Sequence, residues 1–592
     1  MAPRPGPLCH LLLLTLSSMA VGKEGPTSPR PYCKAAPGTT SWPSATSWAR
    51  FNESVNGRLL QPTPPGAVCH PGQPTFNDTQ CVAVNATWST YEFHAADPVS
   101  VDWNQWANDT CLPWSGYHCS RDGYPKVVLN ASTAAHVKAG VDFARKHNVR
   151  LVVKSSGHDY VGRSNAPNSL SIWTHHLKTE FSFHDSFRPK NCKVEIKSTA
   201  VTAGAGAEMI ELYTALDARN QTIVGGGGKT VSLGGYITGG GHSLLSARHG
   251  LAADQVLEVE LVTPKGDIVT ANECTNPDLF WAVRGGGGST FGILTSLTLK
   301  THPTPSISTR TVMVTTDNTN PSTFDMMAYV LSQFPSLGDS GLSGYSFLFS
   351  SFPNPFDNSS TPVPVSGMFL ILTLQDQPPT TIDTLLAPLF THLNTTFPPF
   401  AVITIPEEHP SFSAWYESHY DTSAAGANIL IGSHLLPRSA LTSNLTASAS
   451  ALREFVSPLG FGTAYLVSGK GVHSVNPRGG SNAVNPGWRT AYVHATNLVG
   501  WTPGNAIQKE EAKARLNKSL QGMKELAPGS GAYLNEANPY EPHWQTTFWG
   551  SNYKRLLRIK RAVDPDDVLW CHPCVGNERW QEVDGQLCRV ER

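Results

Sequence analysis

The stretch LVVKSSGHDYVGRS, residues 151–164, begins as a β-strand and ends as a loop of small and polar residues. Its apolar residues stop at Lys154, and His158 follows three small residues. A capped turn would explain the small residues alone. The alternative is that a bound molecule approaches this backbone closely and that the imidazole of His158 reaches it. The stretch therefore predicts a strand followed by a candidate binding loop.

Helix and strand patterns on both sides of this loop predict a mixed α+β fold. Residues 134–147 carry Val137, Val141 and Ala144 at helical spacing, and residues 149–153 form an apolar strand pattern. Strand-like and helix-like stretches continue to residue 302. The sequence then becomes rich in proline and threonine, which indicates a second domain.

Glycine runs at residues 225–228, 239–241 and 285–288 need a physical reason, because glycine is costly inside regular structure. A flexible linker is one explanation, but β-branched or aromatic residues flank each run. Close approach of backbone N–H groups to a phosphate-bearing or planar cofactor is the favoured one. Two nucleotide motifs fail here. A P-loop would need glycine in place of Ile223, and a dinucleotide fingerprint would need glycine in place of Met209.

Three stretches, in this order, resemble one superfamily of flavoproteins. They are KSSGHDYVGRSNAPNSLSIWTHHLK (154–178), GGYITGGGHSLLSARHGLAADQVLEVELVTPKGDIVTANE (234–273) and NPDLFWAVRGGGGSTFGI (276–293). They are similar to the flavin-binding domain of the vanillyl alcohol oxidase and p-cresol methylhydroxylase superfamily. Within it, the chain resembles the berberine bridge enzyme-like branch, particularly secreted fungal FAD-linked oxidoreductases of the isoamyl alcohol oxidase type. The segment FWGSNYKRLLRIKRAVDPDD (548–567) resembles the end of the flavin domain in that branch.

The resemblance is strong over residues 124–302, moderate over 485–570 and weak between them. It implies an α+β fold, with an FAD-binding domain of two subdomains and an α+β substrate domain built on an antiparallel sheet. We expect the chain to be divided into five parts. These are a signal peptide (1–22), an irregular disulfide-tied segment (23–123), the FAD-binding domain (124–302), the substrate-binding domain (303–540) and a C-terminal segment that returns to the FAD domain (541–592).

Several features predict a secreted, extracellular glycoprotein. Arg4 precedes an apolar run from about Leu11 that is too short to span a bilayer, as in a secretory signal peptide. No other stretch predicts a membrane span, and a formal net charge of −1 gives no reason to expect nucleic acid. Acceptor patterns for N-linked glycans occur at Asn52, Asn77, Asn85, Asn108, Asn130, Asn220, Asn358, Asn394, Asn444 and Asn517.

The cysteines fit the same compartment. Cys9 lies in the signal peptide, which leaves an even set for disulfides. This set is Cys33, Cys69, Cys81, Cys111, Cys119, Cys192, Cys274, Cys571, Cys574 and Cys588. Cys571 and Cys574 could also bind zinc or act as a redox pair. Because no second CxxC motif completes a zinc site, a structural disulfide is favoured and no metal is predicted.

The resemblance implies FAD beside the loop and the glycine runs. In this family the histidine at the position of His158 is bonded to the 8α carbon of the flavin, and a neutral imidazole is a competent nucleophile. Relatives with a second tether have cysteine where this chain has Gly228, so a single covalent link is expected. Val231 stands where relatives control access of O2, and valine there is typical of oxidases.

The other expected FAD-binding residues follow from the same resemblance. A first group would offer backbone N–H groups to the pyrophosphate or line the same loop: Lys154, Ser155, Ser156, Gly157, Asp159 and Ser164. A second group would let backbone approach the flavin ring and the ribityl chain: Gly234, Gly235, Gly239, Gly240 and Gly241. Val262 or Ile268 would contact the adenine through its backbone, and Asn552 would return to the flavin edge.

Relatives also suggest where the catalytic side chains lie. Tyr533 is the tyrosine of an AYxN segment, and strand alternation would place Tyr492 and His494 on one face. Tyr533 is the first candidate for the base, provided that positive charge or strong hydrogen bonding lowers its pKa from about 10. His494 needs no such adjustment.

These residues predict a secreted FAD-dependent oxidase. It would transfer a hydride from an alcohol or a sugar hydroxyl group to the flavin and pass the electrons to O2, giving H2O2. Two alternatives stay open from the sequence. One is a flavin dehydrogenase or an oxidative cyclase of secondary metabolism, and the other is a secreted flavoprotein that binds a ligand without turnover.

Overall fold

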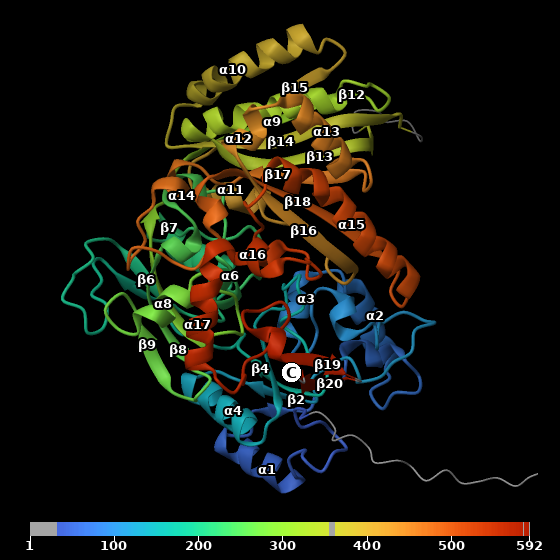
Figure 1. Ribbon diagram of the computed structural model, residues 1–592, viewed down its shortest axis with the longest axis vertical. Coiled ribbons are helices and arrows are strands. Elements are labelled where there is room, and N and C mark those ends of the chain that lie inside the picture. Colours follow the sequence, from blue (N-terminus) through green and yellow to red (C-terminus); the bar gives the residue numbers. More distant parts are fainter. Residues whose placement is uncertain (1–31, 355–361, 584, 591–592) are drawn as a thin grey trace, which may run out of the picture.

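The computed structural model describes residues 32–354, 362–583 and 585–590. The expected signal peptide and Asn358 lie outside the described residues. The chain forms two lobes (Figure 1). The first lobe holds two small sheets and the loop at His158, and the second lobe holds one large sheet with helices on its outer side. This mixed helix and sheet architecture confirms the α+β expectation.

The first small sheet carries the strand that precedes the loop. Its order is β1 (Leu59–Leu60), β2 (Val127–Asn130), β4 (Ser169–Trp173) and β3 (Arg150–Lys154). Strands β2, β4 and β3 are parallel, so a crossover must join them, and helix α4 (Ala134–Lys146) provides the one between β2 and β3. The helix begins where the Thr133 side chain accepts a hydrogen bond from the His136 N–H, as predicted from the helical spacing of its apolar residues.

The second small sheet is antiparallel and has five strands. In spatial order these are β5 (Ser182–His184), β6 (Ala200–Gly204), β10 (Ile293–Lys300), β8 (Val256–Val262) and β9 (Ile268–Ala271). The helices of this half are α5 (Met209–Asp217), α6 (Leu233–Gly239), α7 (Ser246–His249) and α8 (Pro277–Val283). A short pair, β7 (Gln221–Thr222) and β11 (His302–Pro303), closes the lobe. Helices α6 and α8 come from the glycine-run stretches, so both runs belong to ordered structure rather than to linkers.

The second lobe is one antiparallel sheet of seven strands, as the resemblance implies. The order is β15 (Ala401–His409), β12 (Ile307–Asp317), β14 (Pro364–Gln375), β13 (Ser343–Pro353), β17 (Phe461–Leu466), β18 (Ala491–Trp501) and β16 (Asn428–Pro437). Its outer face packs against α9 (Thr323–Asp339), α10 (Pro379–Thr396), α12 (Arg438–Thr442), α13 (Leu445–Val456) and α15 (Ala506–Leu526) (Figure 1). Helices α11 (Phe412–His419) and α14 (Lys470–Ser474) lie toward the first lobe. The inner face of the sheet therefore supplies side chains to the boundary between the lobes.

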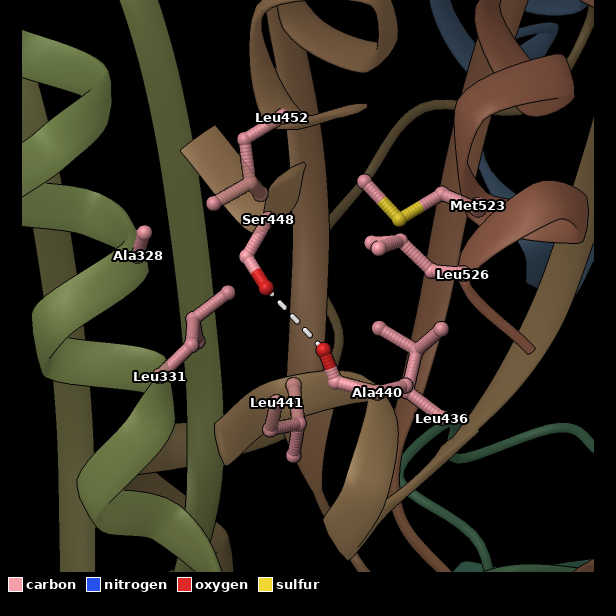
Figure 2. Close-up of a pocket in the computed structure, with 9 residues that line it drawn as sticks. All are labelled: Ala328, Leu331, Leu436, Ala440, Leu441, Ser448, Leu452, Met523 and Leu526. Carbon is pink, nitrogen blue, oxygen red and sulfur yellow. Dashed lines mark hydrogen bonds between the residues drawn. The ribbon is translucent and has the colours of Figure 1, made fainter. Parts of the chain in front are cut away.

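A small pocket within the helix layer of the second lobe is a packing gap. Figure 2 shows its lining, which is apolar except for one hydroxyl: Ala328, Leu331, Leu436, Ala440, Leu441, Ser448, Leu452, Met523 and Leu526. The Ser448 hydroxyl donates a 3.0 Å hydrogen bond to the carbonyl of Ala440, so no polar group is left to orient a ligand. The functional site must lie elsewhere.

The segment before residue 124 is more regular than the sequence suggested. It contains α1 (Ala45–Ser54), α2 (Asp78–Thr87) and α3 (Tyr91–Ala96). The expectation of an irregular segment was wrong because α1 and α3 are short and α2 buries no residue, so apolar spacing is weak. Caps mark all three, since side chains of Ser44, Asn77 and Thr90 each accept a bond from a first-turn N–H.

Disulfides tie this segment to itself and to the C-terminus, as the even cysteine set predicts. The pairs are Cys33–Cys588, Cys69–Cys81, Cys111–Cys119, Cys192–Cys274 and Cys571–Cys574. The C-terminal elements are α16 (Trp544–Trp549), α17 (Tyr553–Val563), β19 (Trp580–Val583) and β20 (Gln586–Arg589), which lie on the first lobe. Within the described residues, no helix combines the length and apolar character needed to cross a bilayer.

Candidate active site

The loop after β3 presents backbone N–H groups that no protein acceptor uses. Within the described residues, the N–H groups of residues 155–159 donate no hydrogen bond, although the carbonyls of Gly157, His158 and Asp159 each accept one. The buried hydroxyl of Ser155 also lacks a partner in this part of the chain. Gly157 has a φ of +104°, which favours glycine. Free N–H groups gathered in this way suit an anion such as a pyrophosphate.

The side chain of Lys154 runs beneath this loop, where its ammonium also reaches the Ser155 carbonyl at 3.4 Å. Its ammonium donates hydrogen bonds to the carbonyls of His94 at 3.0 Å and Asp97 at 2.8 Å. Burial lowers the pKa of Lys154 to about 8, against the opposing attraction of Asp97 and Asp102. Lys154 thus holds the N-terminal segment beneath the loop, and only its backbone could belong to a cofactor cradle.

His158 lies between a buried carboxylate and a hydroxyl. Its Nδ1 is 3.0 Å from Oδ2 of Asp102, and its Nε2 is 2.7 Å from Oγ1 of Thr230. Burial lowers the pKa of His158 to about 3, helped by nearby His94 and Lys154, so the imidazole is neutral at physiological pH. Burial also raises the pKa of Asp102 well above its usual value. With Nδ1 facing the carboxylate, Nε2 is the nitrogen whose lone pair points toward Thr230.

The residues proposed for control of the flavin edge lie beside this imidazole. A Cβ added to Gly228 would sit 4.0 Å from Cε1 of His158 and 3.1 Å from a methyl group of Val231. Position 228 therefore lies next to the imidazole of His158. Val231 is half-buried, and its carbonyl accepts a bond from the Met209 N–H.

The second glycine run lines the boundary between the lobes. A Cβ at Gly239 would lie 2.2 Å from the side-chain amide of Asn535, and one at Gly241 would lie 2.7 Å from the ring of Tyr236. Gly240 and Gly241 have φ values of +119° and +71°, so glycine is required at both. A Cβ at Gly234 would lie 3.2 Å from the carbonyl oxygen of Ala205, while one at Gly235 would meet nothing within 4 Å. The run 239–241 is thus packed closely against protein atoms, and open space lies at Gly235.

A polar network joins the loop at His158 to the segment at Tyr533. Asp159 accepts a 3.0 Å bond from Nε of Arg163, and Arg163 also donates at 2.9 Å to Oδ1 of Asn535. The amide of Asn535 then donates to the Gly235 carbonyl at 3.2 Å and to the Tyr533 hydroxyl at 3.1 Å. These hydrogen bonds therefore fix the position of the loop at His158 relative to the segment that contains Tyr533.

Next to Tyr533, one carboxylate bridges two histidines. Glu536 accepts from Nε2 of His242 at 2.9 Å and from Nε2 of His494 at 2.8 Å, each on a different oxygen. His242 follows the second glycine run, and His494 comes from the inner face of β18. The two imidazole rings lie 5.2 Å apart and 5.2 and 5.7 Å from the Tyr533 ring.

The protonation of this cluster follows from its contacts. Burial alone would raise the pKa of Glu536, but the two imidazoles hold that pKa well below its usual range. Burial lowers the pKa of His494, against the opposing effect of Glu536. With Nε2–H directed to the carboxylate, Nδ1 of His242 and of His494 carry lone pairs, and both atoms are buried without a partner among the described residues. Each Nδ1 is therefore available to accept a proton.

The structure disfavours Tyr533 as the base. Burial raises its pKa, and the neighbouring Glu536 raises it further, which outweighs the hydrogen bond from Asn535 and the distant positive charge of Arg163. The sequence argument required positive charge close to this phenol, and a carboxylate lies there instead. Tyr533 is placed to donate a hydrogen bond, while His494 takes over as the candidate base.

Tyr492 does not share a face with His494. The pairing of β16 with β18 skips Tyr492, because a β-bulge lies between the pairs Leu436–Val493 and Pro437–Ala491. The bulge turns Tyr492 into the apolar core of the second lobe, where its hydroxyl donates to Asp339 at 2.9 Å. Strict alternation was the wrong assumption, and Tyr492 lies outside the site.

The remaining residues predicted to bind the cofactor are Asn552, Val262, Ser164 and Ser156, and only some of them lie at the site. Asn552 donates a 2.8 Å bond to the carbonyl of Val484, whose side chain lies 3.2 Å from the position of a Cβ on Gly240. Asn552 therefore supports the wall of the site. Val262 is paired on both sides within its sheet, which disfavours an adenine contact through its backbone. Ser164 and Ser156 lie on the loop, half-buried and buried respectively.

Sequence reasoning missed Asp102, Thr230, His242, Asn535 and Glu536 as members of the site. His242 and Asn535 stood inside the quoted motifs, and Glu536 directly follows the AYxN segment; all three were passed over beside the glycines and Tyr533. Thr230 ends the GGGGKT run. Asp102 has no local signal, because only the fold brings the N-terminal segment against His158.

Two protein families match the chain. The family described as FAD binding domain matches residues 125–272, and the one described as berberine and berberine like matches residues 532–576. The first range holds His158 with its loop and the second glycine run. The second range holds Tyr533, Asn535 and Glu536.

Known proteins are also similar to this chain over its whole length. The chain is 33% identical over 606 residues to the VAO-type flavoprotein oxidase VAO615 of Thermothelomyces thermophilus, covering 99% of this chain and 100% of the relative. It is 33% identical over 611 residues to the bifunctional decalin synthase calF of Penicillium decumbens, covering 98% and 99%. The crystal structure of the VAO-type flavoprotein MtVAO713 from Myceliophthora thermophila C1 aligns with a TM-score of 0.86 at 29% identity, over 95% of this chain and all of that one.

The site fits the cofactor that these relatives imply. The free N–H groups of residues 155–159 suit the pyrophosphate, and Gly227 and Gly235, where an added Cβ would meet nothing within 4 Å, leave open space that suits the flavin ring. The chain therefore belongs to the vanillyl alcohol oxidase family, as an FAD-linked oxidoreductase of its berberine bridge enzyme-like branch.

Proposed function

We propose that this protein is an FAD-dependent oxidase that converts an alcohol or a sugar hydroxyl group to a carbonyl group. The alcohol loses two hydrogens with their electrons, and O2 takes them up as H2O2. Bound FAD supplies the hydride acceptor and the route to O2. The observation that carries the proposal is the buried histidine pair bridged by Glu536, next to the glycine run.

The chain's own task is to hold the hydroxyl group and to take its proton. Nδ1 of His494 accepts that proton, while Glu536 keeps Nε2–H in place and stabilises the imidazolium that forms. His242 can bind a second hydroxyl group in the same way. Tyr465 and Trp488 lie beside His494, with ring centroids at 6.3 and 5.6 Å, and offer apolar faces to a sugar ring or an aromatic alcohol.

A substrate screen tests this proposal. Primary alcohols, monosaccharides and oligosaccharides are incubated with the purified holoenzyme, and H2O2 is measured together with bleaching of the flavin without O2. We expect at least one class to bleach the flavin anaerobically and to release peroxide in air. Bleaching without peroxide in air would identify a dehydrogenase and contradict the oxidase.

The proposal also sets the direction of the pH dependence. Only neutral His494 can accept a proton, and burial lowers its pKa below the usual value near 6.5. We therefore expect kcat/KM to be flat near neutral pH and to fall as the pH drops through this lowered pKa. Because Glu536 opposes the lowering, its replacement by glutamine should move the acid limb to still lower pH. If the acid side of the kcat/KM profile does not move in Glu536→Gln, a group other than His494 is responsible for the titration.

We further propose that FAD is attached through His158 alone. His158 would hold the cofactor through a C–N bond from its imidazole, and the bound flavin would supply the oxidising power that this bond needs. Neutral His158, with Nδ1 3.0 Å from a carboxyl oxygen of Asp102, supports this assignment. Gly228, which lies next to His158, has no side chain that could form a second bond to the cofactor, and this supports a single link.

A second candidate function is an oxidative cyclase, because one full-length relative is named a decalin synthase. Polyene substrates that return cyclised products, with flavin reduction but no alcohol oxidation, would favour it. Secretion with N-linked glycans is also proposed, supported by the five disulfides and by exposed acceptor sites such as Asn77, Asn220 and Asn444.

A further inference from the structure

Far from the loop at His158 in the sequence, a carboxylate and two imidazoles converge at the edge of the large sheet. Glu407 and His409 are two residues apart on β15, so both side chains leave the same face of the strand. His419 ends α11 and approaches from the other side. Nε2 of each histidine lies 3.5 Å from the same oxygen of Glu407, and all three ligand atoms lie within 4.8 Å of one another.

The contacts of His419 define which atom faces the carboxylate. Its Nδ1 lies 3.0 Å from the carbonyl oxygen of Trp415, and a carbonyl only accepts, so Nδ1 carries the hydrogen. In the neutral ring Nε2 then holds a lone pair that points at an oxygen of Glu407. Nε2 of His409 is buried and has no hydrogen-bond partner among the described residues. Three possible ligand atoms thus face one another, and no hydrogen bond joins them among the described residues.

We propose that Glu407, His409 and His419 bind a divalent transition-metal ion of the zinc class. Zinc holds imidazole nitrogen and carboxylate oxygen at about 2.0–2.2 Å, which in a tetrahedron separates neighbouring ligand atoms by about 3.3–3.5 Å. The 3.5 Å separations of each Nε2 from the carboxylate oxygen match this spacing without movement of the backbone. Two imidazoles with one carboxylate suit zinc better than magnesium or calcium, which prefer oxygen alone.

The surroundings of the cluster also match a metal site. A ligating histidine commonly donates its other N–H to a backbone carbonyl, as His419 does to Trp415. The histidine side chains are 14% and 10% exposed and the Glu407 side chain is 34% exposed, so water can supply the fourth ligand from the carboxylate side. The ion would join a strand of the second lobe to α11.

Helix α11 gives such an ion a structural role. Phe412 and Tyr416 of this helix pack against Tyr213 of the first lobe, with ring centroids at 5.1 and 4.6 Å. Just after His419, the N–H of Asp421 donates a 3.1 Å bond to the carbonyl of Gly227. The proposed metal therefore joins β15, at the edge of the large sheet, to α11. Helix α11 and the residues after it contact the first lobe at Tyr213 and Gly227. This inference does not depend on the proposed reaction.

Metal analysis of the holoenzyme tests the inference. The protein is purified without a polyhistidine tag, dialysed, and its zinc content is measured by mass spectrometry. We expect about one zinc per chain, or its uptake by chelator-treated holoenzyme with a rise in melting temperature. His409→Ala and His419→Ala should lose the ion, whereas the exposed-residue control His118→Ala should keep it. Less than about a tenth of an ion per chain, with no uptake, would overturn the inference.

The histidine pair at Glu536 must be distinguished, because it also offers three ligand atoms within 4.8 Å. Zinc that is lost from Glu536→Gln and kept in the His409 and His419 variants would lie in the active site and overturn the inference. If the alanine variants fail to fold, Glu407→Gln preserves the side-chain shape and should still lose the ion. X-ray absorption at the zinc edge of the wild type should show two imidazoles with oxygen ligands. A sulfur shell or an all-oxygen shell would count against the site.

Discussion

A Glu536→Gln variant should lose about 100- to 10,000-fold in kcat/KM while it keeps its FAD, which is the usual contribution of a positioned base. The carboxylate accepts Nε2–H from both His242 and His494. An amide offers one oxygen and one NH2 group, so one imidazole would face a donor and move its own hydrogen to Nδ1. If His494 is that imidazole, the lone pair that takes the substrate proton is lost; in either orientation of the amide, the negative charge that stabilises the imidazolium is lost.

A matched control separates this effect from loss of structure. Glu541→Gln, five residues further on, removes a buried carboxylate that bonds Lys524 and no residue of the site. This control should keep its kcat/KM within a few-fold of the wild type. If Glu536→Gln does the same, the histidine pair is not the proton acceptor and the proposed chemistry fails.

The second large effect concerns attachment of FAD. His158→Ala should bind FAD without a covalent bond, so acid precipitation should release all of the flavin into the supernatant. Asp102→Asn should retain a folded site but attach FAD at least about tenfold more slowly, since the amide preserves the shape but cannot exchange a proton with Nδ1 of the imidazole as the carboxyl group can. The measurement is the fraction of flavin that pellets with acid-denatured protein over time.

Histidines elsewhere provide the control. His176→Ala alters an exposed imidazole at the end of β4 and should leave attachment unchanged. Flavin that still pellets fully with His158→Ala would show that another residue carries the link. Attachment at the wild-type rate in Asp102→Asn would remove this carboxylate from the process.

Much of the FAD-binding half could be predicted because local rules decide its elements. Helix α4 follows its Thr133 cap and apolar spacing, and α17 ends at Val563, just before Asp564 and Pro565, as the sequence indicates. The sequence indicated a physical need for glycine at Gly240 and Gly241, and both have positive φ values and close contacts that require it. The antiparallel sheet of the second lobe came from family resemblance, since its own sequence carries no decisive motif.

The catalytic roles could not be assigned from the sequence, because they depend on contacts between distant segments. Tyr492 lies on the opposite face from the one predicted, because a β-bulge interrupts the alternation of side chains in β18. The pattern of apolar residues in the sequence does not reveal such a bulge. Tyr533 lost its proposed role because Glu536, three residues later, places negative charge beside it. Asp102 reaches His158 only through the fold of an N-terminal segment whose three short helices lack a clear apolar pattern.

The most direct test of the central claim needs no substrate. Wild-type protein is denatured in acid, digested, and the peptide that carries the flavin is identified by mass spectrometry. We expect the mass of FAD on the peptide that contains His158 and on no other peptide. FAD found free in the supernatant, or bound to a different residue, would contradict the assignment of His158 beside Asp102 and Thr230 as the attachment site.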